Sequence, residues 1–435
     1  MEHIELAIAA IGIMFFLLGS GVWIGLALMG VSIVCMALFS TRPAGDAMAT
    51  TIWGSLTSWT LTPLPLFIWM GEILFRTRLS ESMFRGLAPW MGNLPGRLMQ
   101  TNIVGCAIFA AISGSSAATC ATIGKITIPE LTKRNYPESM IIGSLAGSGT
   151  LGLLIPPSII MIVYGVAADV SISKLFIAGV IPGIMLALLF MGYVGAWSLL
   201  HADRIPPNDI QMTFAEKVKN SAALIPSILL ILSVLGSIYG GIATATEAAA
   251  IGVLAALILA RVQGGLNGTS FWDSVMGAVR TTSMIMLILA GSAFLSLAMG
   301  FTGLPRMLAQ TVSAMGLSQV ELLIALTILY IVLGCFLDGI SMVVLTMAVL
   351  LPVIQQAGFD LLWFGIYVVL AVEMAQVTPP VGFNLFVLQG LTRRSIGYVS
   401  RVAFPFFLLM VVAVALITVF PEIVSALPNH MKMAR

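Results

Sequence analysis

The chain has 435 residues, of which 59% are hydrophobic and only 9% are charged, and its formal net charge is +2. A soluble domain carries about 25% charged residues, so this composition excludes a soluble globular protein. The charge is close to neutral and no basic patch with interleaved aromatics occurs, so we expect no nucleic-acid partner. The four cysteines lie in apolar runs without metal-ligand or disulfide spacing, which indicates neither a transition-metal site nor a disulfide framework.

The first half of the chain reads as a series of membrane segments. Apolar runs of about 20 residues span a bilayer, and such runs recur from Ile4 to Phe420. Residues 1–5 contain two glutamates but no Lys or Arg, so the basic region of a cleavable signal is missing. In chain order, the apolar runs of this half are residues 4–19, 22–40, 60–75, 98–130, 138–168 and 173–199.

Two shorter segments lie between these runs. Residues 42–59 contain two tryptophans in a mixed polar sequence, which predicts a helix at the membrane interface. Residues 79–95 are similar in kind, and we expect them to form an arm that connects a fixed frame to the segment that follows.

A polar linker, residues 201–220, joins this half to a second half of the same design. Three prolines of the first half recur 223 positions later in the second: the pairs are Pro129 and Pro352, Pro156 and Pro379, and Pro157 and Pro380. The same offset places each apolar run of the first half on an apolar run of the second. The counterparts of the interfacial helix and the arm are residues 264–280, before the third span of the second half, and residues 302–318, before its hairpin. We therefore expect two structural repeats, residues 1–200 and 221–422, and a tail over residues 423–435.

Basic residues predict how the repeats lie in the membrane, because cytoplasmic loops are enriched in Lys and Arg. The run 98–130 begins beside Arg97 and ends beside Lys133 and Arg134, so we expect it to enter and leave from the cytoplasm as a re-entrant helical hairpin. Its counterpart, residues 321–353, is flanked by acidic or neutral residues and is expected to enter from the outside.

The two repeats would then have inverted topology. Each repeat is expected to contain three spans, a re-entrant hairpin, an interrupted helix over 138–168 or 361–391, and a final span. This arrangement predicts an all-α polytopic membrane protein with a cytoplasmic linker and with both termini outside. Inverted repeats with broken helices are typical of secondary transporters, whose binding sites lie at the breaks.

Four segments contain the expected breaks: residues 113–119, 147–158, 337–341 and 375–382. Prolines remove backbone donors and break helices, and the freed carbonyls, with Ser and Thr hydroxyls, are oxygen ligands suited to a small cation. Half-helix N-termini carry partial positive charge and favour a carboxylate. Each hairpin tip with its interrupted helix could thus hold a Na⁺ ion, with an anionic substrate between the two pairs. Asp338 is the carboxylate at a hairpin tip, and an intramembrane acid is usually functional.

Plainer interpretations remain open for these residues. Small residues line close helix contacts in membranes, and the Pro-Pro pairs could be simple kinks. Asp338 could be a solvated loop residue. Lys125 either extends its amine to the cytoplasm or faces the substrate path. Glu247 and Glu373 are expected near the outer interface or in a pair, without an assigned role.

The sequence resembles the large membrane subunit (M subunit) of the tripartite ATP-independent periplasmic (TRAP) transporters, of the ion transporter superfamily. The resemblance is carried by ISGSSAATCATIG (112–124), SGTLGLLIPPSIIMIVYG (148–165), LDGISMVVLTMAVLLPVI (337–354) and VTPPVGFNLFVLQG (377–390), and it covers essentially the whole chain. No four-span segment precedes Met1, so the chain looks like an unfused large subunit.

The resemblance implies a sodium-coupled importer of an organic acid, such as a C4-dicarboxylate or a sialic acid, that works by an elevator-like movement of the hairpin domain in the bacterial inner membrane. It also implies two partners, a small membrane subunit of four spans and a periplasmic substrate-binding protein. No cofactor is expected beyond Na⁺ as the coupling ion. The expected sodium-binding residues are Ser113, Gly114, Ser115, Ser116, Gly149, Thr150, Asp338, Gly339, Ser341, Gln376 and Thr378. The expected substrate-binding residues are Ser116, Thr119, Ser148, Pro156, Ser341 and Pro379.

Other functions fit less well. An intramembrane serine protease needs an embedded His, and His3, His201 and His430 lie outside the spans; an aspartyl protease needs a Gly-x-Gly-Asp run that is absent before Asp338. An ATP-driven pump needs a P-loop, which the sequence lacks. A stand-alone sodium/dicarboxylate symporter of the same superfamily is the closest alternative, and a channel is a more distant one.

Overall fold

A computed structural model describes residues 12–39, 42–77, 79–207, 212–263, 265–380 and 382–431. Helices and turns make up this part of the chain, and no strand occurs in it. Six of its helices are long and apolar enough to cross a membrane, and a bent pair counted as one span makes seven. The expectation of an all-α multi-pass membrane protein is therefore confirmed.

The first half begins with helical residues 12–19. The helices that follow are α2 (Ile24–Phe39), α3 (Ala44–Leu56), α4 (Pro63–Phe75), α5 (Leu79–Met91), α6 (Gln100–Ser113), α7 (Ser116–Lys133), α8 (Glu138–Leu154), α9 (Ile159–Ala167) and α10 (Ile172–Leu200). Helices α8 and α9 form the pair that is bent, by 43°, at a short break.

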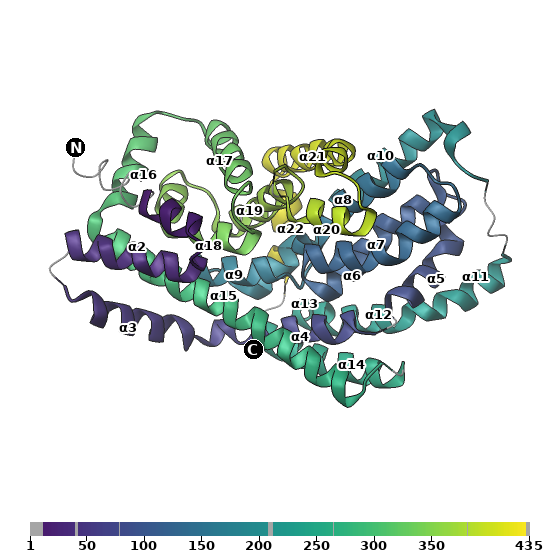
Figure 1. The fold of residues 1–435 in the computed structure, drawn as a ribbon, viewed down its shortest axis with the longest axis horizontal. Coiled ribbons are helices and arrows are strands. Elements are labelled where there is room, and N and C mark those ends of the chain that lie inside the picture. Colours follow the sequence, from purple (N-terminus) through teal and green to yellow (C-terminus); the bar gives the residue numbers. More distant parts are fainter. Residues whose placement is uncertain are drawn as a thin grey trace.

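The second half follows residues 201–207 and 212–213. Its helices are α11 (Phe214–Ser221), α12 (Ile225–Ile231), α13 (Ser237–Tyr239), α14 (Ala245–Val262), α15 (Gly268–Thr302), α16 (Leu304–Ala314), α17 (Gln319–Leu333), α18 (Gly339–Gln356), α19 (Leu361–Gln376), α20 (Phe383–Thr392), α21 (Ile396–Val419) and α22 (Glu422–His430). Helices α8, α9, α19 and α20 gather in the middle of the molecule (Figure 1).

Helix boundaries and packing follow the offset of 223 residues. Helices α7 and α18 are separated by 223 positions at both ends, and α8 and α19 at their first residues. Contacts between the halves come in exchanged pairs: α9 packs on α18 while α20 packs on α7, and α10 packs on α19 while α21 packs on α8. Likewise, α2 packs on α15 while α4 packs on α14. Such exchange is the contact pattern of two bodies related by an approximate two-fold axis.

The repeats differ in their third segment. Residues 42–59 contain a separate helix, α3, as expected, but residues 264–280 do not, because α15 runs without interruption for 35 residues. The prediction of a separate interfacial helix there is wrong. Pro63 and Pro65 start α4 afresh in the first half, whereas Met286 and Ile288 occupy the corresponding positions of α15 and allow the helix to continue.

Two segments named from the sequence as a linker and a tail contain helices. The linker ends in α11, whose first turn is closed by a capping box between Thr213 and Glu216. The tail contains α22, which packs against α10. A bidentate ion pair from Arg394 to Glu138, with both N–O distances at 2.7 Å, joins the start of α8 to the loop before α21.

Candidate functional site

The tip of the first hairpin is a tight turn between α6 and α7. Helix α6 ends at Gly114, which adopts a left-handed conformation with φ of 62° that favours glycine. Ser115 caps α7 by accepting a hydrogen bond from the Ala118 amide. The Thr119 hydroxyl lies 2.7 Å from the Ser113 hydroxyl and 2.8 Å from the Ser115 carbonyl. Ser113, Ser116 and Thr119 are all buried, so the tip places several hydroxyl and carbonyl oxygens in a small volume away from solvent.

This tip lies directly on the break between α8 and α9. The Ile159 amide donates to the Gly114 carbonyl at 3.3 Å, so the first hairpin supplies the acceptor that the broken helix needs. A Cβ at Gly152 would lie 2.6 Å from the Ser115 carbonyl oxygen, and one at Gly114 would lie 2.7 Å from the Pro157 carbonyl oxygen. Glycine at both positions therefore allows the two backbones to approach closely.

The tip of the second hairpin is built around Asp338. Its carboxylate caps α18 by accepting from the Ile340 and Ser341 amides at 3.1 Å and 3.4 Å, and it also accepts from the Ser341 hydroxyl. Asp338 is half-buried and Ser341 is fully buried. The alternative of a freely solvated Asp338 does not fit these contacts, since its oxygens are directed at the start of the helix.

The tip of the second hairpin lies close to both helix breaks. The Cys335 thiol lies 3.5 Å from the Pro379 carbonyl oxygen, across from the end of α19. A Cβ at Gly339 would lie 3.1 Å from Nε2 of Gln376 and 2.9 Å from the Ile160 side chain of α9. The fold thus brings all four predicted segments together in the middle of the molecule, where α9 and α19 are labelled in Figure 1. Val381 of the fourth segment lies outside the described residues.

Some of the predicted site residues face the hairpin tips, and others point away from them. Gly149 faces α7, where a Cβ would lie 2.8 Å from the Cβ of Cys120. The Ser148 hydroxyl points away from the hairpin tip, toward α6, where it lies 3.4 Å from the Asn102 carbonyl. Pro156 is buried at the first break, whereas Pro379 is exposed at the second. Thr378 donates to the Met374 carbonyl at 2.7 Å, which leaves its oxygen lone pairs free at the end of α19.

Glu373 is the polar residue that sequence reasoning left without a role. It is fully buried on α19, one turn before Gln376, and not at an interface. Its carboxylate lies against the Thr150 side chain and the Leu154 backbone of α8. Glu247, by contrast, is an exposed capping residue that accepts from the Thr244 amide at 2.8 Å. The offset of 223 could have singled out Glu373, because it falls on Thr150.

Lys125 lies on α7 and remains exposed, with its ammonium 5.6 Å from the centre of the Phe75 ring of α4. This contact joins the first hairpin to the neighbouring frame helix by a cation–π interaction. It places Lys125 between α7 and α4.

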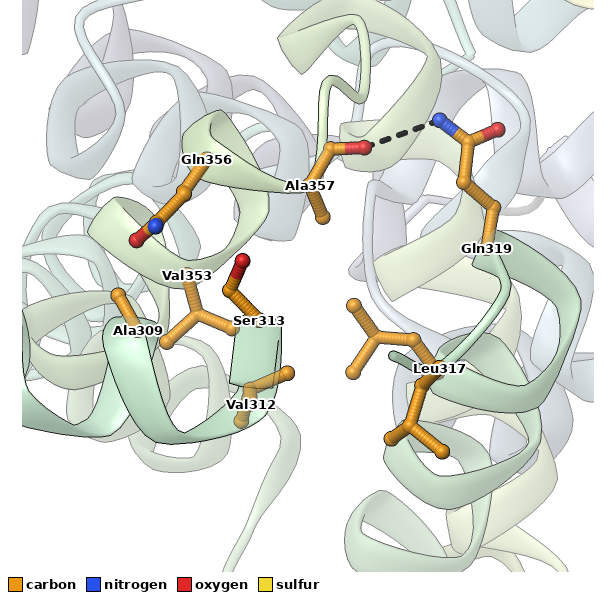
Figure 2. Close-up of a pocket in the computed structure, with 9 residues that line it drawn as sticks. Ala309, Val312, Ser313, Leu317, Gln319, Val353, Gln356 and Ala357 are labelled. Carbon is orange, nitrogen blue, oxygen red and sulfur yellow. Dashed lines mark hydrogen bonds between the residues drawn. The ribbon is translucent and has the colours of Figure 1, made fainter. Parts of the chain in front are cut away.

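Two of the cavities in the described part of the chain adjoin α18 or the end of α19. One cavity of about 110 Å³ lies between α16, α17 and α18, where Gln319 donates to the Ala357 carbonyl at 3.0 Å (Figure 2). It is at the far end of α18, about 25 Å along the helix from the hairpin tip at 1.5 Å per residue. Another cavity, of about 480 Å³, reaches the second break, and it is lined by Val377, Thr378, Pro379, Ser400, Arg401, Phe404 and Phe407.

Comparison with known proteins gives a consistent family. Residues 11–423 match the family described as "Tripartite ATP-independent periplasmic transporter, DctM component". The C4-dicarboxylate TRAP transporter large permease protein DctM of Pseudomonas aeruginosa is 30% identical, over 93% of this chain and 95% of that protein. The isethionate TRAP transporter permease protein DctMQ of Oleidesulfovibrio alaskensis is 33% identical over 94% of this chain, which spans 64% of that longer protein.

A solved structure supports the fold. The YdaH transporter of Alcanivorax borkumensis superimposes with a TM-score of 0.67, over 92% of this chain and 98% of that one. The two sequences are 14% identical, so this likeness concerns the fold alone.

The hydroxyl network of the first tip predicts a contrast between two threonines of α7. Replacing Thr119 by Val keeps the shape but removes the hydroxyl that pairs with Ser113 and Ser115, so we expect a loss of about 1–3 kcal/mol of stability. Thr122→Val is the matched control, because the buried Thr122 hydroxyl has no hydrogen-bond partner among the described residues, and its removal should cost nothing. Thermal unfolding in detergent measures the stability of both variants. Equal losses of stability would contradict a stabilising hydrogen-bond network at Thr119.

Proposed function

Because the chain belongs to the DctM component family of the tripartite ATP-independent periplasmic transporters, we propose that it is the large membrane subunit of a sodium-coupled importer of a small organic acid. The family is one of permeases and not of enzymes, which confirms the expectation of a transporter. The observation that carries the proposal is the meeting of two hairpin tips with two helix breaks at the centre of the fold.

The oxygen atoms at the tips support sodium as the coupling ion. Na⁺ prefers hard oxygen ligands, and the first tip offers the Ser113, Ser116 and Thr119 hydroxyls beside the Ser115 carbonyl, which accepts from the Thr119 hydroxyl. The second tip offers the Asp338 carboxylate and the Ser341 hydroxyl, near Gln376 and Thr378. Because the first tip has hydroxyls where the second has a carboxylate, the two ion sites would differ in affinity.

An organic acid fits between the tips and beside the second break. The N-termini of α7 and α18 lie in this region, capped by Ser115 and Asp338, and partial positive charge at a helix N-terminus favours a carboxylate. The cavity at the second break adds the Arg401 guanidinium to an otherwise largely apolar lining, which suits a short carbon chain with a terminal acid group. Relatives named for C4-dicarboxylate and sialic acid support this substrate class.

The proposal includes partners and a membrane orientation. We propose a small membrane subunit and a periplasmic binding protein as partners, which the fused name of one relative, DctMQ, supports for the membrane part. The exchanged contacts between the halves support an inverted repeat, and the basic loops support an inner-membrane protein with both termini in the periplasm. A moving hairpin domain, as in an elevator mechanism, would then expose the site to each side in turn.

Reconstitution tests the proposed function. Liposomes that contain this chain alone, with an inward sodium gradient, should not take up a radiolabelled C4-dicarboxylate or sialic acid. Uptake should begin when the small membrane subunit is co-reconstituted and the matching ligand-loaded binding protein is added. Robust uptake by the chain alone would instead favour the stand-alone symporter, and a current that does not saturate would favour a channel.

Asp338→Asn tests the second sodium site. Asn keeps an oxygen that can cap α18 but removes the charge, so the sodium concentration for half-maximal uptake should rise about tenfold. Asp360→Asn is a matched control, since Asp360 also caps a helix, accepting from the Trp363 amide at 2.8 Å, but at the far end of α19. Unchanged sodium dependence in Asp338→Asn would remove this residue from the site.

Cysteine labelling tests the inverted repeat. Cys335 lies half-buried at the second tip, while Cys35, Cys106 and Cys120 are buried, so an impermeant maleimide should report on Cys335 in the natural protein. Ser115→Cys in a Cys335→Ser background reports on the first tip. When the sodium and substrate gradients are reversed, the two labelling rates should change in opposite directions, by several-fold. Parallel changes would contradict inverted topology.

A further inference from the structure

Helices α8 and α19 pack against each other at the centre of the fold, and their contact contains a buried carboxylate. Glu373 is 0% exposed, and neither of its oxygens has a hydrogen-bond partner among the described residues. A carboxylate taken out of water without a partner is very costly. The protein must therefore either keep Glu373 protonated or place a cation beside it.

The groups of α8 that lie against Glu373 are polar but uncharged: the Thr150 side chain and the Leu154 backbone. The Thr150 hydroxyl donates to the Gly147 carbonyl at 2.8 Å. On α19, Gln376 is three residues further on and so lies on the same helix face. Its Oε1 also has no partner in the described part of the chain, while its Nε2 faces the second hairpin tip at Gly339.

The offset of 223 residues also indicates where the contact between Thr150 and Glu373 lies. Thr150 and Glu373 are separated by 223 residues, so they occupy the same place in the two halves, and they touch. Two equivalent residues can touch only close to the axis that relates the halves. The acid is therefore placed between the two hairpin-and-break pairs, and it is present in one repeat and absent from the other.

We propose that Glu373 is the charged ligand of a small monovalent cation at this axis, with Thr150 and Gln376 supplying neutral oxygens. The sequence predicts Thr150 and Gln376 in the two ion sites at the hairpin tips. Both residues lie beside Glu373, so this proposal places them in a third, central site instead. The identity of the cation as Na⁺ rests on the proposed function, whereas the position of the site rests on the fully buried carboxylate without a hydrogen-bond partner among the described residues.

Sodium-dependent stabilisation tests this site without transport. The protein, co-purified with its small membrane subunit, is unfolded thermally while NaCl replaces choline chloride at constant ionic strength. The wild type should be stabilised by Na⁺, and Glu373→Gln should raise the half-maximal sodium concentration about tenfold or abolish the shift. Glu373→Asp should retain a sodium response. Glu321→Gln is the control, because Glu321 is an exposed capping residue whose role Gln can fill, and it should behave like the wild type.

The outcomes separate this inference from the proposed function. Gln has the shape of a protonated glutamate, so a Glu373→Gln protein with wild-type sodium response would show that Glu373 is a neutral structural acid, and it would overturn the site. If Glu373→Gln does not fold, Thr150→Val must raise the sodium concentration about threefold, and an unchanged value overturns the site as well. Sodium-independent uptake by the wild type would overturn the coupling, while a Glu373-dependent stabilisation would still uphold the cation site.

Discussion

The structure depends on one constraint: backbone polar groups freed at membrane depth must find partners inside the protein, because the bilayer core offers none. The breaks after α8 and α19 expose such groups, and the hairpin tips satisfy part of them. The hydrogen bond from the Ile159 amide to the Gly114 carbonyl is the clearest instance, since it joins a broken helix to the hairpin of the same repeat. A hairpin and its broken helix are therefore held together as one unit.

The two hairpin tips are closed by different chemical groups. At the first tip, a backbone turn at Gly114 and a hydroxyl network among Ser113, Ser115 and Thr119 close the end of the hairpin. At the second tip, the Asp338 carboxylate closes it by capping α18. Hydroxyls leave the first tip neutral, whereas a carboxylate at the second tip is costly to bury without a partner. Under the proposed function, a cation would therefore bind more strongly at the second tip.

Much of this could be predicted from the sequence, because prolines and glycines act locally. Pro156 and Pro157 break a helix wherever they stand, and the offset of 223 found their counterparts without any knowledge of packing. The continuous α15 was missed because interruption there depends on the presence of Pro63 and Pro65 in one repeat only. The burial of Glu373 was missed for a different reason. It depends on how α8 packs against α19, and the sequence of an apolar helix with one acid does not distinguish a helix at the membrane interface from one in the protein core.

The position of Glu373 bears on how transport could be tied to a cation. With an ionised and unpaired Glu373, the centre of the fold carries a net negative charge among acceptor oxygens, which opposes any movement through an apolar environment. In the proposed site, a bound cation would cancel that charge and join α8 to α19 through ligands from both helices. With the cation bound, the site around Glu373 is thus neutral and α8 is linked to α19. Without the cation, the site is charged and the two helices are not linked through it. If only the neutral, cross-linked form crosses the membrane, then coupling follows from the cost of burying one charge, without a separate gate for the ion.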